Sequence, residues 1–273
     1  MINNIKPKII ISSQQNSAVQ LCLNLLANSS NKDKKKYFIA EGHKLIKTLI
    51  QKYKPFLLLT TESFLNELND LNDYQPQIQI VSDKLWLILN QDLLSPTKLI
   101  GVFEKPANKF KLNHELENGF YLILDRIQDP GNMGTLLRTA AAANWQNIIS
   151  LKGSVDIFSP KVIRASAGAI AHLNIMTSIE EELLKENLAS QGNDFSLICT
   201  SSHAKTDINQ LNLLIKNKSK IALVLGNEGQ GIAKSLMNLE RAELVKIPMN
   251  EQIESLNVSV AGALLIFKLS GLV

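Results

Sequence analysis

The stretch LILDRIQDPGNMGTLLRTAAA (residues 122–142) decides the fold that the sequence predicts for this chain. An apolar run ends at Asp125, a Pro-Gly turn follows, and a helix with several small residues begins near Asn132. A buried strand followed by a helix that packs closely on it is the repeating unit of an α/β domain with a parallel sheet. Gly134 and Arg138 are four residues apart and share one helical face, so this turn is the first candidate site.

The pattern continues through residues 119–273, which we predict to form one domain. The predicted strands are apolar runs at residues 120–125, 147–151, 173–177, 195–200, 221–226 and 244–248. The predicted helices lie near residues 133–143, 160–170, 179–189, 206–216, 232–238 and 257–270. Ligands of parallel sheets bind beyond the carboxyl ends of the strands, so the loops after residues 124, 199, 225 and 247 are the places to look.

Residues 1–105 are predicted to form a separate, smaller α/β domain. Its predicted strands are residues 37–41, 55–60, 78–82 and 99–104, and its predicted helices are 16–29, 43–53, 62–71 and 84–91. The run NKDKKK (31–36) is interpreted as a solvated turn, and residues 106–118, polar and without periodicity, as the linker. Only three of the 13 glycines precede residue 120, so ligand chemistry is expected in the C-terminal domain.

The composition is that of a folded protein of two domains. The 273 residues are 45% hydrophobic and 20% charged, and no apolar run approaches the roughly 18–20 residues of a membrane span. The N-terminus lacks the features of a signal peptide, so a cytoplasmic location is expected. Cys22 and Cys199 lie far apart in apolar segments and are interpreted as buried free thiols, and no structural metal site is expected.

Basic residues are distributed unevenly along the chain. Residues 1–54 contain ten Lys and two acidic residues, a balance of +8, whereas the rest contains 19 basic and 23 acidic residues, a balance of −4. This asymmetry favours an anionic partner such as nucleic acid for the N-terminal part, and a solvated lysine face is the alternative. Three of the four arginines, Arg126, Arg138 and Arg164, cluster where a planar fork of donors suits phosphate.

Two further loops carry polar groups at the ends of predicted strands. In IALVLGNEGQGI (221–232) three glycines follow a buried strand, and Glu228 stands between them. This spacing differs from the dinucleotide-binding fingerprint, so a nucleotide-dependent dehydrogenase is disfavoured. In IPMNEQIESLNVSVAGALLIF (247–267), Ser255, Asn257 and Ser259 begin an apolar helix whose amino end suits an anion or a developing negative charge.

Together the three loops resemble the three ordered motifs of the SpoU (TrmH) family of RNA 2′-O-ribose methyltransferases, in the SPOUT superfamily. The matching segments are Asn132-x-Gly134-x-x-x-Arg138-Thr139-Ala140, Leu225-Gly226-Asn227-Glu228-Gly229-x-Gly231, and Ile247-Pro248-Met249 followed by residues 254–261. Residues 36–50 also resemble the start of the family's N-terminal RNA substrate-binding domain, which is similar to the L7Ae/L30e fold of ribosomal proteins. The resemblance implies a C-terminal sheet threaded into a trefoil knot, and a homodimer to which helix 257–270 contributes.

The resemblance also implies a cofactor, S-adenosyl-L-methionine, and roles for individual residues. The implied catalytic residues are Arg138, Asn132, Glu228, Ser255 and Asn257. The implied cofactor-binding residues are Thr200, Leu225, Gly226, Asn227, Ile247, Met249 and Leu256. The expected RNA-binding residues are Lys34, Lys35, Lys36, Lys44 and Arg164, the last with a place at the dimer interface as an alternative.

The implied reaction is transfer of a methyl group to a ribose 2′-hydroxyl of structured RNA, with 23S ribosomal RNA expected as the substrate. Arg stays protonated below roughly pH 12, so a cationic Arg138 that binds phosphate and stabilises alkoxide is favoured over Arg138 as a base. The alternatives are a transfer-RNA 2′-O-methyltransferase and an RNA-binding ribosome-assembly factor without catalysis. Neither a metal nor a membrane partner is expected.

Overall fold

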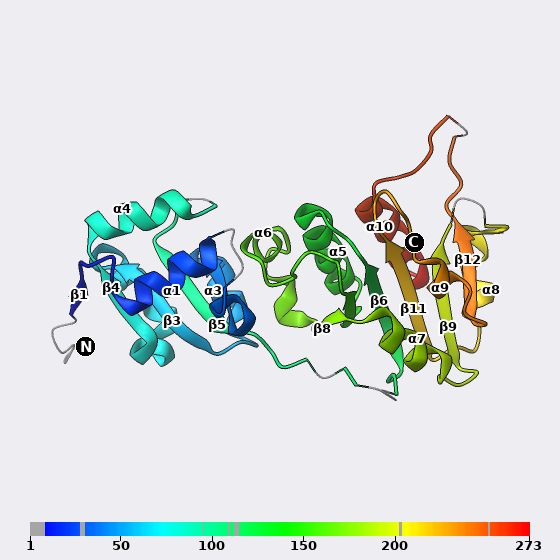
Figure 1. Cartoon of the computed structure of the whole chain (residues 1–273), viewed down its shortest axis with the longest axis horizontal. Coiled ribbons are helices and arrows are strands. Elements are labelled where there is room, and N and C mark those ends of the chain that lie inside the picture. The colour runs from blue at the N-terminus through cyan, green and yellow to red at the C-terminus, as the bar shows by residue number, and fades with distance from the viewer. Residues whose placement is uncertain are drawn as a thin grey trace. The chain divides into compact units, whose positions relative to one another are not determined.

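The computed structural model describes residues 9–27, 31–94, 96–108, 110–111, 115–201, 204–250 and 252–273. The chain divides into two compact units (Figure 1). The first contains the residues up to Pro106 together with Phe158–Ala171, and the second contains Ala107–Ile157 and His172–Val273. The segment 158–171 therefore belongs, by its contacts, to the first unit, although it lies within the range 119–273 predicted as one domain.

Within the described residues, the first unit has a five-stranded sheet in the order β1-β4-β3-β5-β2. β5 runs antiparallel to β2 and β3, whereas β1, β4 and β3 are parallel. The strands are β1 (Ile10–Ile11), β2 (Tyr37–Glu41), β3 (Pro55–Thr61), β4 (Ile78–Val81) and β5 (Leu99–Glu104). The helices are α1 (Ser17–Leu26), α2 (Asp33–Lys36), α3 (His43–Leu49), the 3₁₀ run η1 (Glu62–Gln77), α4 (Asp83–Asp92), and, later in the chain, α6 (Pro160–Ala165) and most of the 3₁₀ turn η2 (Ala169–His172).

Both faces of this sheet are covered by apolar side chains. Helices α1 and α4 bury a continuous cluster against one face, which includes Cys22, Ile39, Leu57 and Val102. On the other face the aromatic rings of Phe38, Phe103, Tyr53 and Phe158 pack together, and the Tyr53 hydroxyl donates to the carbonyl of Ile170 at 3.2 Å. The aromatic packing explains why the segment 158–171 joins this unit.

The second unit has a seven-stranded sheet among the described residues, in the order β10-β12-β9-β11-β6-β7-β8, with every neighbouring pair parallel. The predicted parallel sheet is thus confirmed. The strands are β6 (Gly119–Asp125), β7 (Asn147–Leu151), β8 (Asn174–Ile179), β9 (Phe195–Thr200), β10 (Thr206–Asp207), β11 (Lys220–Gly226) and β12 (Ala242–Lys246). The helices are α5 (Pro130–Ala142), α7 (Glu181–Ala189), the 3₁₀ turn η3 (Ile208–Gln210), α8 (Leu211–Leu214), α9 (Lys234–Met237) and α10 (Val258–Leu269).

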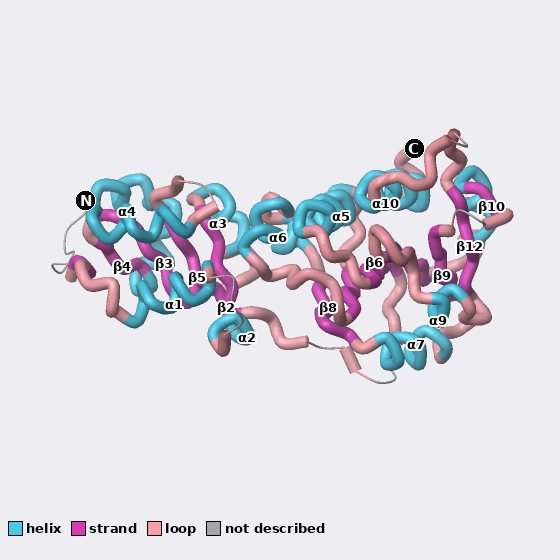
Figure 2. The backbone as a smooth tube through the Cα atoms, turned by 45° about the horizontal axis from the view of Figure 1, so that its top comes forward, coloured by secondary structure: helices cyan, strands magenta, loops and turns pink. Residues whose placement is uncertain are grey.

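Helices cover both faces of the parallel sheet. In Figure 2, α5 and α10 lie on one side of the strands and α7 and α9 on the other. Between the sheet and helices α7 and α9 lies a cluster of buried apolar side chains, which includes Leu184, Leu236 and Val224. On the opposite side α10 packs on α5 and β11 at close range, because a Cβ at Gly262 would lie only 2.4 Å from Leu136 and 2.6 Å from Leu225. This packing holds the start of α10 beside the end of β11.

Several predicted elements are wrong in type or extent. The predicted helix 62–71 is instead the 3₁₀ run η1, which is kinked at Leu68 and Leu71, since turn-forming Asn and Asp compete with regular helix. The predicted helix 206–216 is a short strand followed by η3 and α8. The NKDKKK turn contains the helical turn α2. The predicted helix 160–170 is broken after α6, where Ala167 and Gly168 have positive φ angles of 50° and 87°.

Other boundaries move by a few residues. Strand β12 ends at Lys246, so Ile247 and Pro248 lie beyond it, and α3 stops at Leu49 rather than at residue 53. Two short edge strands were not predicted: β1 pairs with β4, and β10 pairs with β12. Each has only two residues, which is too short to show a periodic pattern in the sequence. Among the described residues, no helix has both the length and the apolar character needed to cross a membrane.

Candidate active site

The three motif loops meet through two side-chain hydrogen bonds. Asn132 Nδ2 donates to Glu228 Oε1 at 3.1 Å, and Asn257 Nδ2 donates to Asn132 Oδ1 at 3.0 Å. The three residues come from the start of α5, the loop after β11 and the start of α10. The structure thus brings three of the predicted catalytic residues together, with Asn132 between the other two.

Helix capping fixes two members of this group. Asp129 caps α5 by accepting from the Asn132 backbone N–H at 2.7 Å, with Pro130 in the first turn. Asn257 caps α10: its Oδ1 accepts from the Ser259 N–H at 2.8 Å and from the Ser259 hydroxyl at 2.6 Å. Because the cap uses the oxygen of Asn257, its amide nitrogen remains free to donate to Asn132. The cap of α10 therefore sets the direction of the hydrogen bond from Asn257 to Asn132, and the cap of α5 fixes the backbone of Asn132.

Asp125 and Arg126 form an ion pair at the end of β6, and both side chains bind the segment after β11. The Asp125 side chain is fully buried and accepts from Arg126 Nε at 2.7 Å and Nη2 at 2.9 Å. Asp125 also accepts from the Ala233 N–H at 2.7 Å, and Arg126 Nη1 donates to Gln230 Oε1 at 3.3 Å. The hydrogen bond to Asp125 raises the pKa of Arg126 further above its usual value. Arg126 adopts a left-handed backbone, with φ of 56°, which turns the chain into the motif loop.

The loop after β11 folds back on its own start. Asn227 Oδ1 accepts from the N–H groups of Gly229 and Gln230 at 2.9 Å each, and its Nδ2 donates to the Arg126 carbonyl at 3.0 Å. A Cβ at Gly226 would lie 2.3 Å from backbone atoms of Gly231 and Ile232, so only glycine fits there. The side chain of Asn227 therefore holds the loop together, and Glu228 projects from it as an exposed carboxylate.

The predicted cofactor-binding residues lie at the carboxyl ends of neighbouring strands. Thr200 ends β9 and pairs with Val245 of β12, Leu225 and Gly226 end β11, and Ile247 and Met249 follow β12. The side chains of Thr200, Ile247, Met249 and Leu256 are half-buried, whereas Leu225 is buried under α10. The half-buried apolar side chains of Ile247, Met249 and Leu256 suit a flat apolar ring with polar edges, so these residues fit an adenosine-containing cofactor.

Arg138 and Ser255 stand apart from the hydrogen-bonded group. Both side chains are exposed, and neither has a hydrogen bond or ion pair among the residues that the structure describes. Arg138 lies in the last turns of α5, six residues after Asn132, and so projects in a different direction around the helix. Its guanidinium is therefore available to an external anion.

The predicted RNA-binding residues lie in the first unit and differ in their surroundings. Lys35 and Lys44 are exposed, whereas Lys34 donates to the Ala27 carbonyl and Lys36 lies 3.5 Å from Glu104. Contact with Tyr37, and secondarily with Glu104, raises the pKa of Lys36, so that this side chain remains cationic.

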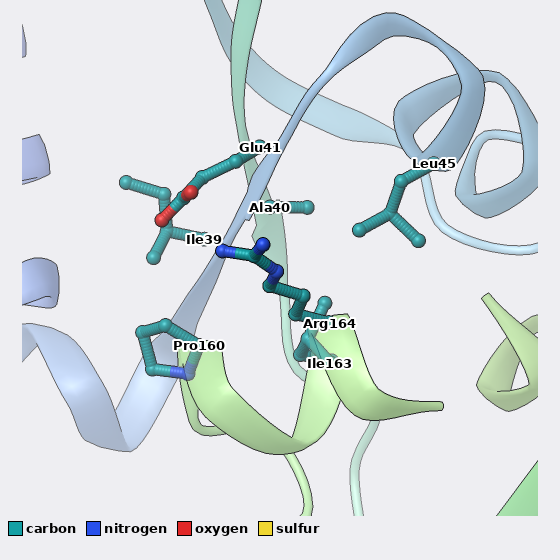
Figure 3. Close-up of a pocket in the computed structure, with 7 residues that line it drawn as sticks. All are labelled: Ile39, Ala40, Glu41, Leu45, Pro160, Ile163 and Arg164. Carbon is teal, nitrogen blue, oxygen red and sulfur yellow. The ribbon is translucent and has the colours of Figure 1, made fainter. Parts of the chain in front are cut away.

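Arg164 borders a small pocket of this unit. Figure 3 shows the Arg164 side chain extending from α6 toward Ala40 and the Glu41 carboxylate of β2. The cavity has a volume of about 50 Å³, and its remaining lining is apolar (Ile39, Leu45, Pro160 and Ile163). Glu41 itself accepts from the Leu94 N–H at 3.1 Å. The Arg164 side chain is thus exposed, and it borders this pocket of the first unit together with Glu41.

Sequence reasoning missed the residues that position the loops. Asp125, Gln230 and Asp129 make the contacts described above, and none was predicted to take part in the site. A charged residue at the end of an otherwise apolar strand was the available signal for Asp125, since buried carboxylates need partners. Gln230 had no comparable signal, because its partner lies 104 residues away in the chain.

Comparisons with known proteins place this chain in a family. Residues 119–267 match the model of the SpoU rRNA Methylase family. A Borreliella burgdorferi protein named as an uncharacterized tRNA/rRNA methyltransferase is 36% identical over 186 residues, covering 68% of this chain and 76% of that one. A Bacillus subtilis 23S rRNA guanosine 2′-O-methyltransferase is 31% identical over 182 residues, which cover 65% of this chain and 66% of that enzyme.

Solved structures resemble nearly the whole chain. A Sinorhizobium meliloti rRNA methyltransferase superposes with a TM-score of 0.80 at 25% identity, covering 97% of this chain and 98% of that one. Its AdoMet-bound form gives a TM-score of 0.78 at 25% identity, with coverage of 96% and 97%. With more than half of its length matched by the family model, the chain belongs to the SpoU rRNA methylase family and is an RNA methyltransferase whose methyl donor is S-adenosylmethionine.

Proposed function

We propose that the protein methylates a ribose 2′-hydroxyl in structured RNA, and that this RNA is the 23S ribosomal RNA. The observation that carries the proposal is the Asn257–Asn132–Glu228 group, which joins the three motif loops into one site. The Bacillus relative, which is named for 2′-O-methylation of 23S rRNA, supports both the chemistry and the RNA class.

Arg138 is the residue that we propose acts on the hydroxyl. A 2′-hydroxyl becomes a good nucleophile only as its proton leaves, so the developing negative charge must be stabilised. The exposed guanidinium of Arg138 stays protonated and offers a fork of donors to the adjacent phosphate and to the alkoxide oxygen. Asn132, Glu228, Ser255 and Asn257 would position the ribose, Arg138 or the cofactor, and the hydrogen bonds that join Asn132, Glu228 and Asn257 support a shared role for those three.

Residues at the strand ends would hold the cofactor. S-adenosylmethionine supplies an electrophilic methyl group on a sulfonium. The half-buried Ile247, Met249 and Leu256 would contact its adenosine part, while Thr200, Leu225, Gly226 and Asn227 would line the remaining loops. We further propose that these loops form the trefoil knot of the family, which would hold them rigidly around the cofactor.

Residues 1–105 would be the RNA substrate-binding domain, of the L7Ae/L30e type, with 106–118 as its linker and 119–273 as the methyltransferase domain. Support comes from the +8 balance of residues 1–54 and from the exposed Lys35 and Lys44. Lys34, Lys36 and Arg164 would add phosphate contacts. A protein that modifies ribosomal RNA in this way would act in the cytoplasm.

A homodimer is proposed as the working form. Val260 and Leu264 are 49% and 43% exposed, and they lie four residues apart on one face of α10. An exposed apolar face on the helix that begins at Asn257 would place a second subunit next to the site.

The experiment that tests this function uses RNA from a strain that lacks the gene. Purified protein and methyl-labelled S-adenosylmethionine are incubated with separated 23S rRNA and tRNA fractions, and the labelled nucleosides are identified. We expect a 2′-O-methylnucleoside in the 23S fraction. Label in the tRNA fraction alone would establish the alternative substrate, and absence of label despite cofactor binding would favour the non-catalytic assembly factor.

The role of Arg138 has its own test. Arg138→Lys keeps the positive charge but loses the planar fork, and we expect the single-turnover rate to fall about 100-fold, the cost of one stabilising donor in comparable sites. Cofactor affinity should be unchanged. A variant with the full rate would show that the guanidinium geometry has no part in the reaction.

A further inference from the structure

A bulge in strand β3 turns an aromatic side chain outward from the first unit. Pro55 pairs with Phe103 and Leu57 pairs with Val102, so two adjacent residues of β5 face three residues of β3. The extra residue is Phe56. Pro55 and Leu57 are buried, whereas the Phe56 side chain is 50% exposed. Bulges re-aim side chains in this way at functional positions as well as at strand ends.

A second ring and a cation complete the surface around Phe56. The Tyr37 ring lies 4.8 Å from the Phe56 ring, with an angle of 36° between their planes. Lys36 Nζ lies 4.8 Å from the Tyr37 centroid, within the range of a cation–π contact, and 3.5 Å from Glu104. Tyr37 also packs on the apolar cluster under α1 and α4, which anchors its ring. We call Lys36, Tyr37 and Phe56 the aromatic platform.

The charge around the platform selects among possible ligands. Two exposed lysines lie near the platform residues in the chain. Lys35 is adjacent to Lys36, and Lys54 is two residues before Phe56. Glu104, the acid in contact with the platform, is paired with Lys36. Lysine is depleted at protein–protein interfaces, whereas aromatic rings among lysines are typical of surfaces that stack unpaired bases and contact their phosphates.

We propose that the aromatic platform binds an unpaired nucleobase of the RNA substrate by stacking on Phe56, with the neighbouring lysines contacting the backbone. The proposal rests on the proposed RNA-binding role of the first unit and specifies how that unit holds RNA. Stacking on one ring tolerates any base, because every base has a π-face. The platform would therefore contribute affinity for single-stranded segments rather than sequence specificity.

The test measures binding of the full-length protein to a single-stranded ten-nucleotide RNA with 2-aminopurine at its centre. Phe56→Ala and Phe56→Leu should each weaken binding roughly 5- to 150-fold, the range for loss of one base–aromatic stack, and should abolish quenching of the 2-aminopurine. Phe56→Trp should retain both. Leu87→Ala, which removes another exposed apolar side chain (67% exposed) of the same unit, should bind as the wild type does.

The outcomes separate this proposal from the function it rests on. If the wild type methylates RNA and binds the oligonucleotide, but Phe56→Ala binds equally well, the platform is wrong and the function stands. Wild-type affinity in Phe56→Leu would also overturn it, because leucine keeps the apolar contact without a π-face. If the wild type neither binds nor methylates RNA, the proposed function itself fails. Equal cofactor affinity and melting temperature in all variants show that the fold is intact.

Discussion

At the scale of single residues, Asn132 is the side chain on which the three motif loops depend. Its amide both donates to Glu228 through Nδ2 and accepts from Asn257 through Oδ1, because a side-chain amide carries a donor and an acceptor on separate atoms. A carboxylate would repel Glu228, and an alanine would leave both partners without this contact. The geometry therefore explains why an asparagine occupies this position.

Replacement of Asn132 should lower the rate of methyl transfer. We expect Asn132→Ala to reduce the single-turnover rate about 10- to 150-fold, since a hydrogen bond to a charged group contributes roughly 1.5–3 kcal/mol. Asn132→Asp should be at least as slow, because it adds a negative charge beside Glu228. Asn238→Ala, at an exposed asparagine after α9, is the matched control. Equal rates for Asn132→Ala and the control would remove Asn132 from the site.

Burial raises the pKa of the two cysteine thiols. It raises the pKa of both Cys22 and Cys199 from 9.0 to about 12, with the charge of Asp125 adding to the effect at Cys199. Below pH 9 both states of the protein keep these protons. Above pH 9 the unfolded chain releases them first, so this contribution to the free energy of unfolding decreases as pH rises toward 12.

The thiols should consequently resist alkylation in the native protein. At pH 8 we expect iodoacetamide to modify both cysteines about 100-fold or more slowly than in urea, because reaction requires opening of the core. Urea midpoints should also be lower at pH 10 than at pH 7. Rapid modification of either thiol in the folded protein would contradict the burial of that residue.

Sequence reasoning named all three residues of the hydrogen-bonded group but not the residues that support them. Each of these residues, Asn132, Glu228 and Asn257, lies in one of the three sequence motifs, so each could be predicted from the sequence alone. Asp125 belongs to the same stretch, yet its importance depends on partners that the fold brings from distant loops. Spacing along the chain reports local structure, whereas such long-range contacts become visible only in three dimensions.

At the scale of elements, the conformation of the loop after β11 depends on one close contact between two stretches of backbone. Gly226 faces the backbone of Gly231 and Ile232, and the side chain of Asn227 closes the turn. Most longer strands and helices of both units were predictable, because apolar runs and caps mark them, but residues 206–216 form β10, η3 and α8 instead of the predicted helix. The kinked η1 and the broken helix after Arg164 were not predictable, since both depend on local backbone geometry that residue patterns describe poorly.

Two glycines of this loop provide a matched pair. Gly226→Ala should lower the melting temperature and abolish cofactor binding, because its Cβ would lie 2.3 Å from backbone atoms that cannot move without opening the loop. At Gly229 the nearest atom to an added Cβ is Asn227 Oδ1 at 3.6 Å, an ordinary contact, so Gly229→Ala should keep the wild-type melting temperature. Thermal unfolding and calorimetry with S-adenosylmethionine measure both effects. Equal behaviour of the two variants would refute the close approach.

At the scale of the whole molecule, the chain combines a mixed sheet with an uneven lysine distribution and a parallel sheet with the methyltransferase motifs. A boundary at residues 106–118 was predicted from their polar, aperiodic sequence and from the change in glycine usage there, and the first segment of unit 1 ends at Pro106. The place of residues 158–171 in the first unit was not predicted, because the aromatic packing of Phe158 with Phe38 and Tyr53 joins segments about 100 residues apart.

Substitutions that introduce a charge on the exposed apolar face of α10 test the proposed dimer. Val260→Glu and Leu264→Glu should each convert a dimer into a monomer and lower methyl transfer at least 10-fold, since burying an unpaired carboxylate at an interface costs several kcal/mol. Leu213→Glu, at an exposed leucine of α8, should remain dimeric. Light scattering after size exclusion gives the mass. A wild-type protein that is monomeric at assay concentration would contradict the proposal.

The most direct test of the central claim is the chemical position of the transferred methyl group. RNA methylated by the purified protein with labelled S-adenosylmethionine is digested to nucleosides, and the labelled products are separated by mass spectrometry. The three joined motif loops predict label on the ribose, as a 2′-O-methylnucleoside, with a strongly reduced yield from Asn132→Ala. Label on a base, or an undiminished yield from that variant, would contradict the account.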